Sequence, residues 1–187
     1  MPSDGAGQRR RHLVERLISP EYRAEQKRLH DEQAAYGSRG FNWGYLVAGI
    51  AMIEGGRSIL DYGCGKGTLA KTLRATPFDV RQYDPAVPSK SALPDPADVV
   101  AALDVMEHIE PDRLEAVMSD LVRVTRRILF VVVATKQSKR WMRDGRNTHL
   151  IVEDGSWWRG KFEAAGFRVR RIWQTGLPEW VAMMEPA

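Results

Sequence analysis

Apolar and polar residues follow two different periods along this chain, and the periods predict strands and helices in alternation. The clearest strand is the nearly continuous apolar run 128–134, which is typical of a strand buried on both faces. The clearest helix begins at Pro111. Its apolar residues recur at intervals of three and four on one face: Leu114, Val117, Met118, Leu121 and Val122. The alternation indicates an α/β protein with a mostly parallel sheet.

The other expected elements continue this order. Two helices are expected ahead of the first strand, one over residues 20–36 with Ser19 as its N-cap, and one that Asn42 caps and that runs to about Ile53. The other strands are expected at 58–62, 80–84 and 98–105, with further helices at 67–75 and 156–165. Residues 167–174 and 179–184 are expected to form a C-terminal antiparallel hairpin.

Glycines cluster where the first strand passes into its helix, in the run Asp61-Tyr62-Gly63-Cys64-Gly65-Lys66-Gly67-Thr68. A turn of this kind brings backbone N–H groups and a helix N-terminus close to a ligand. A phosphate-binding P-loop needs Ser or Thr after its lysine, and Gly67 stands there. The dinucleotide fingerprint needs a glycine where Thr68 stands. The run therefore excludes a P-loop and disfavours a nicotinamide-dependent oxidoreductase.

The composition is that of an ordinary soluble globular protein, with 187 residues, 43% hydrophobic and 28% charged, and a net charge of +4. Residues 1–12 are expected to be a disordered basic tail, and residues 13–187 one domain. We expect no secretory signal and no transmembrane segment, because the early arginines precede no apolar segment of sufficient length. The single cysteine, Cys64, excludes an intramolecular disulfide and is in keeping with a cytoplasmic location.

Three features together resemble the class I S-adenosylmethionine-dependent methyltransferases. The run D-x-G-x-G-x-G, residues 61–67, is similar to motif I of that family. Asp84 lies 21 positions after Gly63, where the family places an acid that accepts hydrogen bonds from the cofactor ribose. The run Leu103-Asp104-Val105-Met106-Glu107-His108 resembles the D-V-L-E-H element, with Met106 in place of Leu. A turn residue before Pro85 is the alternative interpretation of Asp84.

The resemblance covers about residues 20–185 and implies a doubly wound, Rossmann-like sheet with S-adenosylmethionine as cofactor. It implies a cofactor site formed by the glycine run, the ends of the next strands and the loop between the two leading helices. These residues are Arg39, Trp43, Asp61, Tyr62, Gly63, Cys64, Gly65, Gly67, Asp84, Pro85, Leu103 and Asp104. Packing of Trp43 against the core is an equally good interpretation of that residue.

One stretch departs from the family. Between Asp84 and Asp98 there are only 13 residues, where the family fits a full helix and another strand. Four prolines in this stretch leave no room for that helix. We expect the unit to be abbreviated to a loop, or to a very short edge strand near residues 91–93.

Candidates for catalysis and acceptor binding follow the third and fourth strands. His108, His149 and Asp104 could take a proton from a hydroxyl acceptor, although a structural role suits His108 equally well. The segment 136–149 is basic, and its candidate acceptor-binding residues are Arg140, Arg143, Arg146 and His149. A solvated loop is its alternative interpretation.

The other histidines, His12 and His30, are expected at the surface. No group of His, Asp and Glu has metal-ligand spacing, so no metal is expected.

The resulting hypothesis is a methyltransferase that acts on a small or medium-sized, possibly anionic acceptor, such as a metabolite or a glycan or lipid intermediate. One alternative is an inactive cofactor-binding module that holds a partner through its basic loop. Another is a methyltransferase that acts on a nucleic-acid component. The chain lacks the [DNS]-P-P-[FYW] and Pro-Cys signatures of DNA methyltransferases, which disfavours those chemistries.

Overall fold

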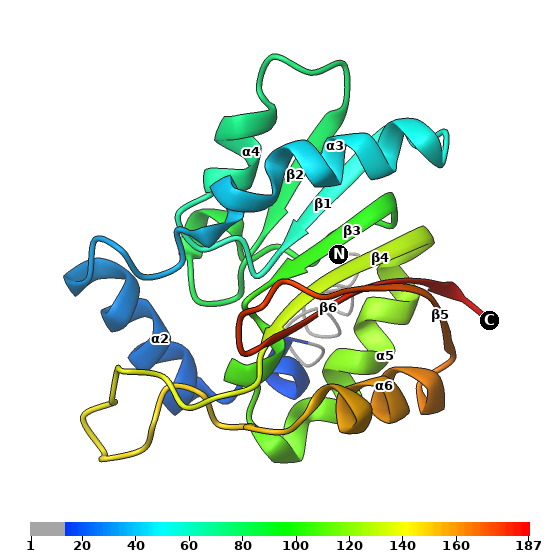
Figure 1. Ribbon diagram of the computed structural model, residues 1–187. Helices are drawn as coiled ribbons and strands as arrows, with labels where there is room; N and C mark the ends of the chain where they lie inside the picture. Colours follow the sequence, from blue (N-terminus) through cyan, green and yellow to red (C-terminus); the bar gives the residue numbers. More distant parts are fainter. Residues whose placement is uncertain (1–13) are drawn as a thin grey trace, which may run out of the picture.

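The structure, a computed structural model, describes residues 14–187 (Figure 1). The expected tail over residues 1–12, with His12, lies outside the described residues. The strands are β1 (Ser58–Tyr62), β2 (Asp79–Tyr83), β3 (Ala97–Leu103), β4 (Thr125–Ala134), β5 (Phe167–Trp173) and β6 (Glu179–Pro186). The helices are α2 (Pro20–Glu32), α3 (Gly44–Ile53), α4 (Thr68–Leu73), α5 (Leu114–Val124) and α6 (Gly155–Ala164).

The described chain forms a six-stranded sheet in the order β2-β1-β3-β4-β6-β5. Strand β1 pairs in parallel with β2 and with β3, and β3 pairs in parallel with β4. Strand β6 is antiparallel to both β4 and β5, and so lies between them. The expected Rossmann-like sheet with a C-terminal antiparallel hairpin is therefore confirmed.

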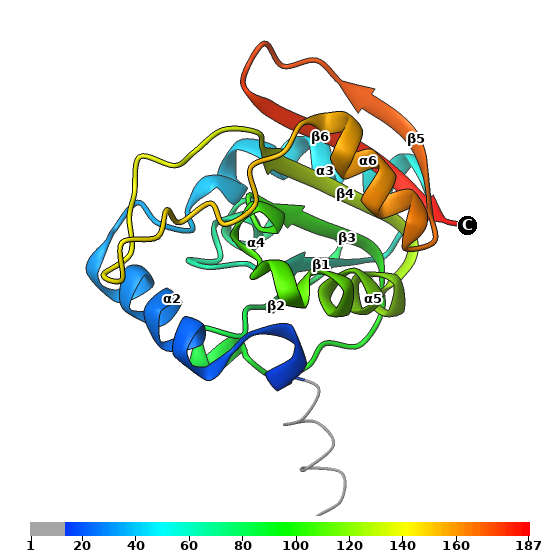
Figure 2. The same ribbon diagram turned by 90° about the horizontal axis from the view of Figure 1, so that it is seen from below.

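Side chains of the central strand β4 alternate between the two faces of the sheet, and each face has its own apolar core. Leu129 and Val131 pack in the core that holds Trp158 of α6 and the apolar side of α5. Phe130 packs on the other face, with Val47 of α3 and residues of α4. Figures 1 and 2 show these helix pairs as layers on opposite faces of the sheet. Because successive side chains of β4 point to opposite faces and both faces are covered by apolar cores, the whole strand is apolar in sequence.

The two leading helices form, with changed boundaries. Ser19 caps α2 as expected, because its Oγ accepts a hydrogen bond from the Tyr22 N–H at 3.1 Å. The expectation that Asn42 caps the next helix was wrong, because Trp43 occupies that position and makes no side-chain cap hydrogen bond. A 3₁₀ helix, Arg39–Trp43, comes first, and α3 begins only at Gly44. The loop between α2 and α3 therefore contains an ordered 3₁₀ turn.

The unit after β2 is abbreviated, as expected. Across residues 84–96, all of which the structure describes, a 3₁₀ helix at Pro88–Lys90 is the only regular element. The alternative of a short edge strand near residues 91–93 was wrong, and β2 is left as an edge strand of the sheet. Within residues 14–187, no helix is both long enough and apolar enough to cross a membrane.

Candidate active site

A cavity of about 430 Å³ lies at the carboxyl ends of β1, β2 and β3. This is the edge at which open α/β sheets bind ligands, and the volume is typical of a small-molecule site. Helix α2 and the segment 134–140 form further walls of the cavity, and Figure 1 shows both at this edge of the sheet.

Most of the predicted cofactor residues line this cavity. They are Arg39, Asp61, Tyr62, Gly63, Cys64, Asp84, Pro85, Leu103 and Asp104. The remaining three, Trp43, Gly65 and Gly67, are not part of its wall. Trp43 packs against Phe130 with ring centroids 5.7 Å apart, so the structure supports the core-packing interpretation of this residue.

The glycines of the D-x-G-x-G-x-G run shape the loop more than they form the cavity wall. Gly63, Gly65 and Gly67 have φ values of 72°, 46° and 68°, a region that favours glycine. A Cβ on Gly65 would lie 2.8 Å from the carbonyl oxygen of Gly37, in the loop between α2 and α3. The motif therefore encodes a left-handed backbone and a close approach between two loops.

Asp84 joins the end of β2 to the glycine loop. Its Oδ2 accepts a hydrogen bond from the Gly65 N–H, and its Oδ1 accepts one from the Ala86 N–H, both at 2.9 Å. Asp84 therefore both stabilises the turn before Pro85 and Ala86 and lines the cavity. Each carboxylate oxygen can accept a second hydrogen bond, so Asp84 keeps capacity for a ligand hydroxyl.

Asp61 is the second carboxylate of the wall, and it is 4% exposed. Burial raises the pKa of its carboxyl group to about 7, against the opposing effect of the Lys90 ammonium. At neutral pH this carboxyl group is therefore poised between its neutral and charged forms. A cationic ligand group beside it would favour the charged form.

The expectation that His30 lies at the surface was wrong. Its ring lines the cavity, and its Nε2 lies 3.8 Å from Oδ2 of Asp84. Tyr22, Gln26 and His30 recur every four residues along α2, and all three line the cavity. This helical spacing was the signal in the sequence that could have identified His30.

Asp104 follows β3 in a left-handed conformation, with φ of 54°. Its Oδ2 lies 2.8 Å from Nε of Arg39, in the 3₁₀ helix ahead of α3. Burial raises the pKa of Asp104 to about 6, while the Arg39 guanidinium opposes that rise. Arg39 therefore lies at the edge of the cavity, as expected, and is bound there by an acidic partner.

The basic segment 136–149 divides into two parts. Arg140 and His149 line the cavity, together with Lys136 and Lys139. Arg143 instead pairs with Glu32 of α2 at 3.0 Å, and Arg146 pairs with Asp144 at 2.6 Å. The structure thus places Arg143 and Arg146 outside the cavity wall, because acidic neighbours hold both guanidinium groups.

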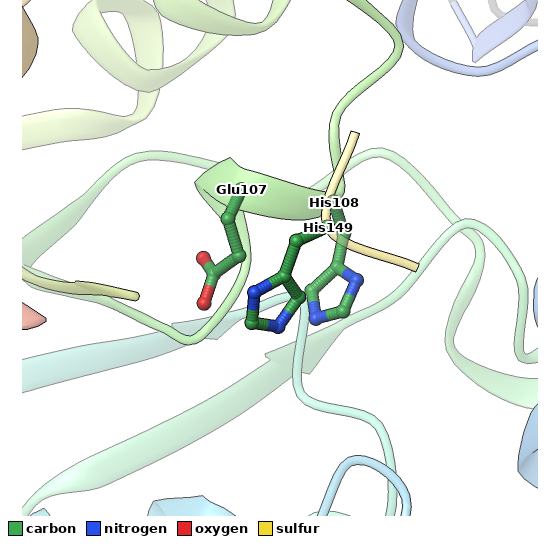
Figure 3. A group of neighbouring side chains, drawn as sticks. All are labelled: Glu107, His108 and His149. Atoms are coloured by element: carbon green, nitrogen blue, oxygen red, sulfur yellow. The ribbon is translucent and has the colours of Figure 1, made fainter. Parts of the chain in front are cut away.

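His108 and His149 come together at the cavity, with ring centroids 4.8 Å apart, and Glu107 lies beside them (Figure 3). The premise that no such residues cluster was wrong, because the fold joins positions that are distant in sequence. Burial, with a smaller effect of His149, lowers the pKa of His108 to about 3, so its imidazole is neutral and a poor proton acceptor.

Comparison with known proteins places this geometry in a family. A family model described as a methyltransferase domain matches residues 15–172. No protein in a collection of curated sequences matches the chain.

Several solved structures share the fold, and three methyltransferases are among them. The mitomycin 7-O-methyltransferase has a TM-score of 0.63 and 18% identity, over 97% of this chain and 67% of its own. The 1,6-didemethyltoxoflavin-N1-methyltransferase of Burkholderia thailandensis, with bound S-adenosylhomocysteine, has a TM-score of 0.61 and 14% identity. The match covers 100% of this chain and 92% of that protein. The magnesium protoporphyrin IX methyltransferase of Synechocystis PCC 6803, also with S-adenosylhomocysteine, has a TM-score of 0.57 and 15% identity. The match covers 98% of this chain and 96% of that protein. The family match spans most of the chain, and the chain belongs to the methyltransferase-domain family.

Proposed function

We propose that this protein transfers the methyl group of S-adenosylmethionine to a small or medium-sized acceptor. The observation that carries the proposal is the position of Asp84. Its carboxylate anchors the glycine loop and lines a cavity at the carboxyl ends of the parallel strands. Membership of the methyltransferase-domain family supports the proposal. The toxoflavin and protoporphyrin methyltransferases were both crystallised with S-adenosylhomocysteine.

Polar atoms of the cavity residues suit a polar cofactor of this kind. Gln26 Nε2, His30 Nδ1 and Tyr83 Oη are buried at the cavity without a hydrogen-bond partner among the described residues. Buried polar atoms left unpaired are costly, so a polar ligand is expected here. Asp84 suits the ribose hydroxyls, and Asp61 suits the ammonium group at the methionine end.

The chain's own residues bind and orient the reactants. When bound, the cofactor would supply a methyl carbon attached to a positively charged sulfur, and the acceptor would bond to that carbon while the carbon–sulfur bond breaks and its electron pair stays with sulfur. Helix α2 and the segment 134–140 wall the cavity and limit the access of water. Alignment of the acceptor with the methyl carbon accounts for most of the acceleration, because a well-oriented pair reacts as if at very high concentration.

The cations at the cavity favour an acceptor with negative charge. Lys136, Lys139 and Arg140 all line the wall. Neither lysine has an ion-pair partner within residues 14–187, so both are available to a carboxylate or a phosphate. The named acceptors of the three solved structures, mitomycin, a toxoflavin precursor and magnesium protoporphyrin, are small molecules.

Calorimetry with S-adenosylhomocysteine tests the cofactor site. We expect the wild type to bind one equivalent, and Asp84→Ala to weaken binding at least about tenfold, since a charge-assisted hydrogen bond contributes about 1.5–3 kcal/mol. Asp112→Ala, which removes a carboxylate with a 75% exposed side chain, is the matched control and should bind like the wild type. Equal binding by Asp84→Ala and the wild type would contradict the proposed site.

Transfer of labelled methyl groups into a native extract then tests the activity. We expect a labelled small molecule. An inactive cofactor-binding module binds S-adenosylhomocysteine but labels nothing, so binding without any labelled product would contradict the proposed activity. Label confined to nucleic acid would contradict the proposed class of acceptor.

A further inference from the structure

Three side chains converge at one wall of the cavity, and we propose that they bind a divalent transition-metal cation. Glu107 and His108 belong to the turn after β3, and His149 ends the basic segment. One potential ligand atom from each lies within 4.8 Å of the others (Figure 3). Figure 3 shows the two imidazole rings side by side, with the Glu107 side chain next to them.

Both imidazoles are held so that one nitrogen is free to bind a metal. Nδ1 of His108 lies 2.6 Å from the carbonyl oxygen of Thr148, and Nδ1 of His149 lies 2.6 Å from that of Lys136. A carbonyl oxygen can only accept, so each Nδ1 carries the hydrogen and each Nε2 keeps its lone pair. A backbone carbonyl on the second nitrogen is a common support for metal-binding histidines.

Glu107 supplies the independent indication of a ligand. The residue is 0% exposed, and its Oε1 accepts a hydrogen bond from the Ala134 N–H at 3.0 Å. Its Oε2 is buried without a hydrogen-bond partner among the described residues. An unpaired carboxyl oxygen in the interior is costly. A cation between Glu107 and the two histidines would satisfy it.

The backbone already holds these groups in position. The carbonyl oxygen of Glu107 accepts hydrogen bonds from the N–H groups of Leu150, at 2.7 Å, and Ile151, at 3.1 Å. Metal–ligand distances of about 2.0–2.2 Å place ligand atoms about 3.5 Å apart, so the group has to contract by about 1 Å. His149 lies outside any helix or strand, and its side chain can make that adjustment.

The donor set indicates the class of ion. Two imidazole nitrogens and one carboxylate oxygen suit zinc, iron, cobalt or nickel better than magnesium or calcium, which prefer oxygen ligands throughout. Three protein ligands leave an open coordination position, as in catalytic zinc sites. His108 and His149 line the cavity, whereas Glu107 lies behind them, so the open position faces the cavity.

This position gives the site a role that rests on the proposed function. A hydroxyl group of the acceptor at the open position has a lowered pKa and loses its proton to water. The oxygen lone pair then forms the bond to the methyl carbon, while the carbon–sulfur bond breaks and its electron pair stays with sulfur. The inference therefore specifies an oxygen acceptor, an alcohol or a phenol.

Metal titration of the full chain without a polyhistidine tag tests the site. After treatment with a chelator, Co²⁺ and Zn²⁺ are added separately, and Co²⁺ binding is followed by its visible absorption. We expect one equivalent to bind, and His149→Gln and Glu107→Gln each to weaken binding at least about tenfold. His30→Gln, which removes a cavity histidine outside the group, is the matched control and should leave the affinity for Co²⁺ unchanged.

Two outcomes would overturn the site, namely no stoichiometric binding by the wild type, or an equal loss in His30→Gln. S-adenosylhomocysteine binding is measured on the same samples. Cofactor binding without metal binding overturns this inference and leaves the proposed function standing. Metal binding without cofactor binding supports the metal site and overturns the proposed function. For the role in transfer, we expect chelation to abolish labelling in the extract and Zn²⁺ or Co²⁺ to restore it. Undiminished labelling in excess chelator would overturn that role.

Discussion

Nε of Arg39 lies 2.8 Å from Oδ2 of Asp104, and Nη2 of the same guanidinium lies 3.2 Å from Oε2 of Glu179. One side chain thereby joins the 3₁₀ helix ahead of α3 to the end of β3 and the start of β6. The Asp104 and Glu179 side chains are 15% and 5% exposed, whereas the Arg39 side chain is 50% exposed. Arg39 therefore balances two acidic groups at the edge of the cavity.

Replacing Arg39 tests this link. We expect Arg39→Gln to weaken S-adenosylhomocysteine binding about three- to tenfold, because the loop ahead of α3 loses its anchor. The free energy of unfolding should fall by about 1–3 kcal/mol, because two largely buried carboxylates lose the cation that balances them. Calorimetry and urea unfolding measure the two effects. Arg159→Gln, which replaces an arginine of similar exposure that pairs with Glu163 on α6, away from the cavity wall, should leave binding unchanged.

The raised pKa of Asp61 predicts a pH-dependent stability. Its carboxyl group titrates at about 3.9 in the unfolded chain and at about 7 in the folded protein, because burial disfavours its charge. The folded state therefore binds more protons between these values, and stability falls as pH rises from about 4 to about 7. We expect Asp61→Asn, which cannot ionise, to be more stable than the wild type at pH 8, by at most about 4 kcal/mol.

Urea unfolding of the cofactor-free protein from pH 5 to pH 8 measures this difference. The advantage of Asp61→Asn should grow with pH and level off above about pH 7. A constant difference between the two proteins across this range would show that Asp61 does not titrate as described.

The same carboxyl group predicts how cofactor affinity depends on pH. A ligand ammonium group beside Asp61 favours the charged carboxylate, so binding below pH 7 releases a proton. We expect affinity for S-adenosylhomocysteine to rise up to about tenfold per pH unit between about pH 5.5 and 7. Calorimetry in two buffers of different ionisation enthalpy counts the proton. In Asp61→Asn both the slope and the proton release should be absent, and their persistence would assign them to another group.

The glycine loop predicts a large effect of one methyl group at Gly65. Gly65→Ala combines a φ of 46°, which costs a non-glycine residue about 1–2 kcal/mol, with a contact of 2.8 Å to the Gly37 carbonyl oxygen. Gly55→Ala has a similar φ of 65° and open space around its new Cβ. Urea unfolding should show Gly65→Ala less stable than Gly55→Ala by about 1–3 kcal/mol. Equal losses would mean that the loops separate to admit the methyl group.

Trp43 distinguishes packing from cofactor contact. Its ring packs against Phe130, so Trp43→Leu should lower the free energy of unfolding by about 1–3 kcal/mol. Affinity for S-adenosylhomocysteine should stay close to that of the wild type, because Trp43 is not part of the cavity wall. A loss of affinity with little loss of stability would restore the cofactor interpretation.

Local patterns predicted the fold well where a single period dominates. The apolar run 128–134 became β4, and the three-and-four spacing after Pro111 became α5, although a 3₁₀ turn at Pro111–Arg113 comes first. Prolines correctly indicated the abbreviated unit after β2. The start of α3 was wrong because Asn42 lies within a 3₁₀ helix whose conformation depends on its contacts. One such contact is the close approach of Gly40 to Leu69.

By itself, the sequence determined the strand–loop–helix run 58–69 and the acid at Asp84, because these depend on the order of residues and on local backbone conformation. It determined the family resemblance for the same reason. Only the tertiary structure decided that Nε2 of His30 lies 3.8 Å from Asp84, that Glu32 of α2 holds Arg143, and that His149 meets Glu107 and His108. These relationships join side chains from distant segments. Their distances follow from how the sheet and α2 pack, which no local spacing contains.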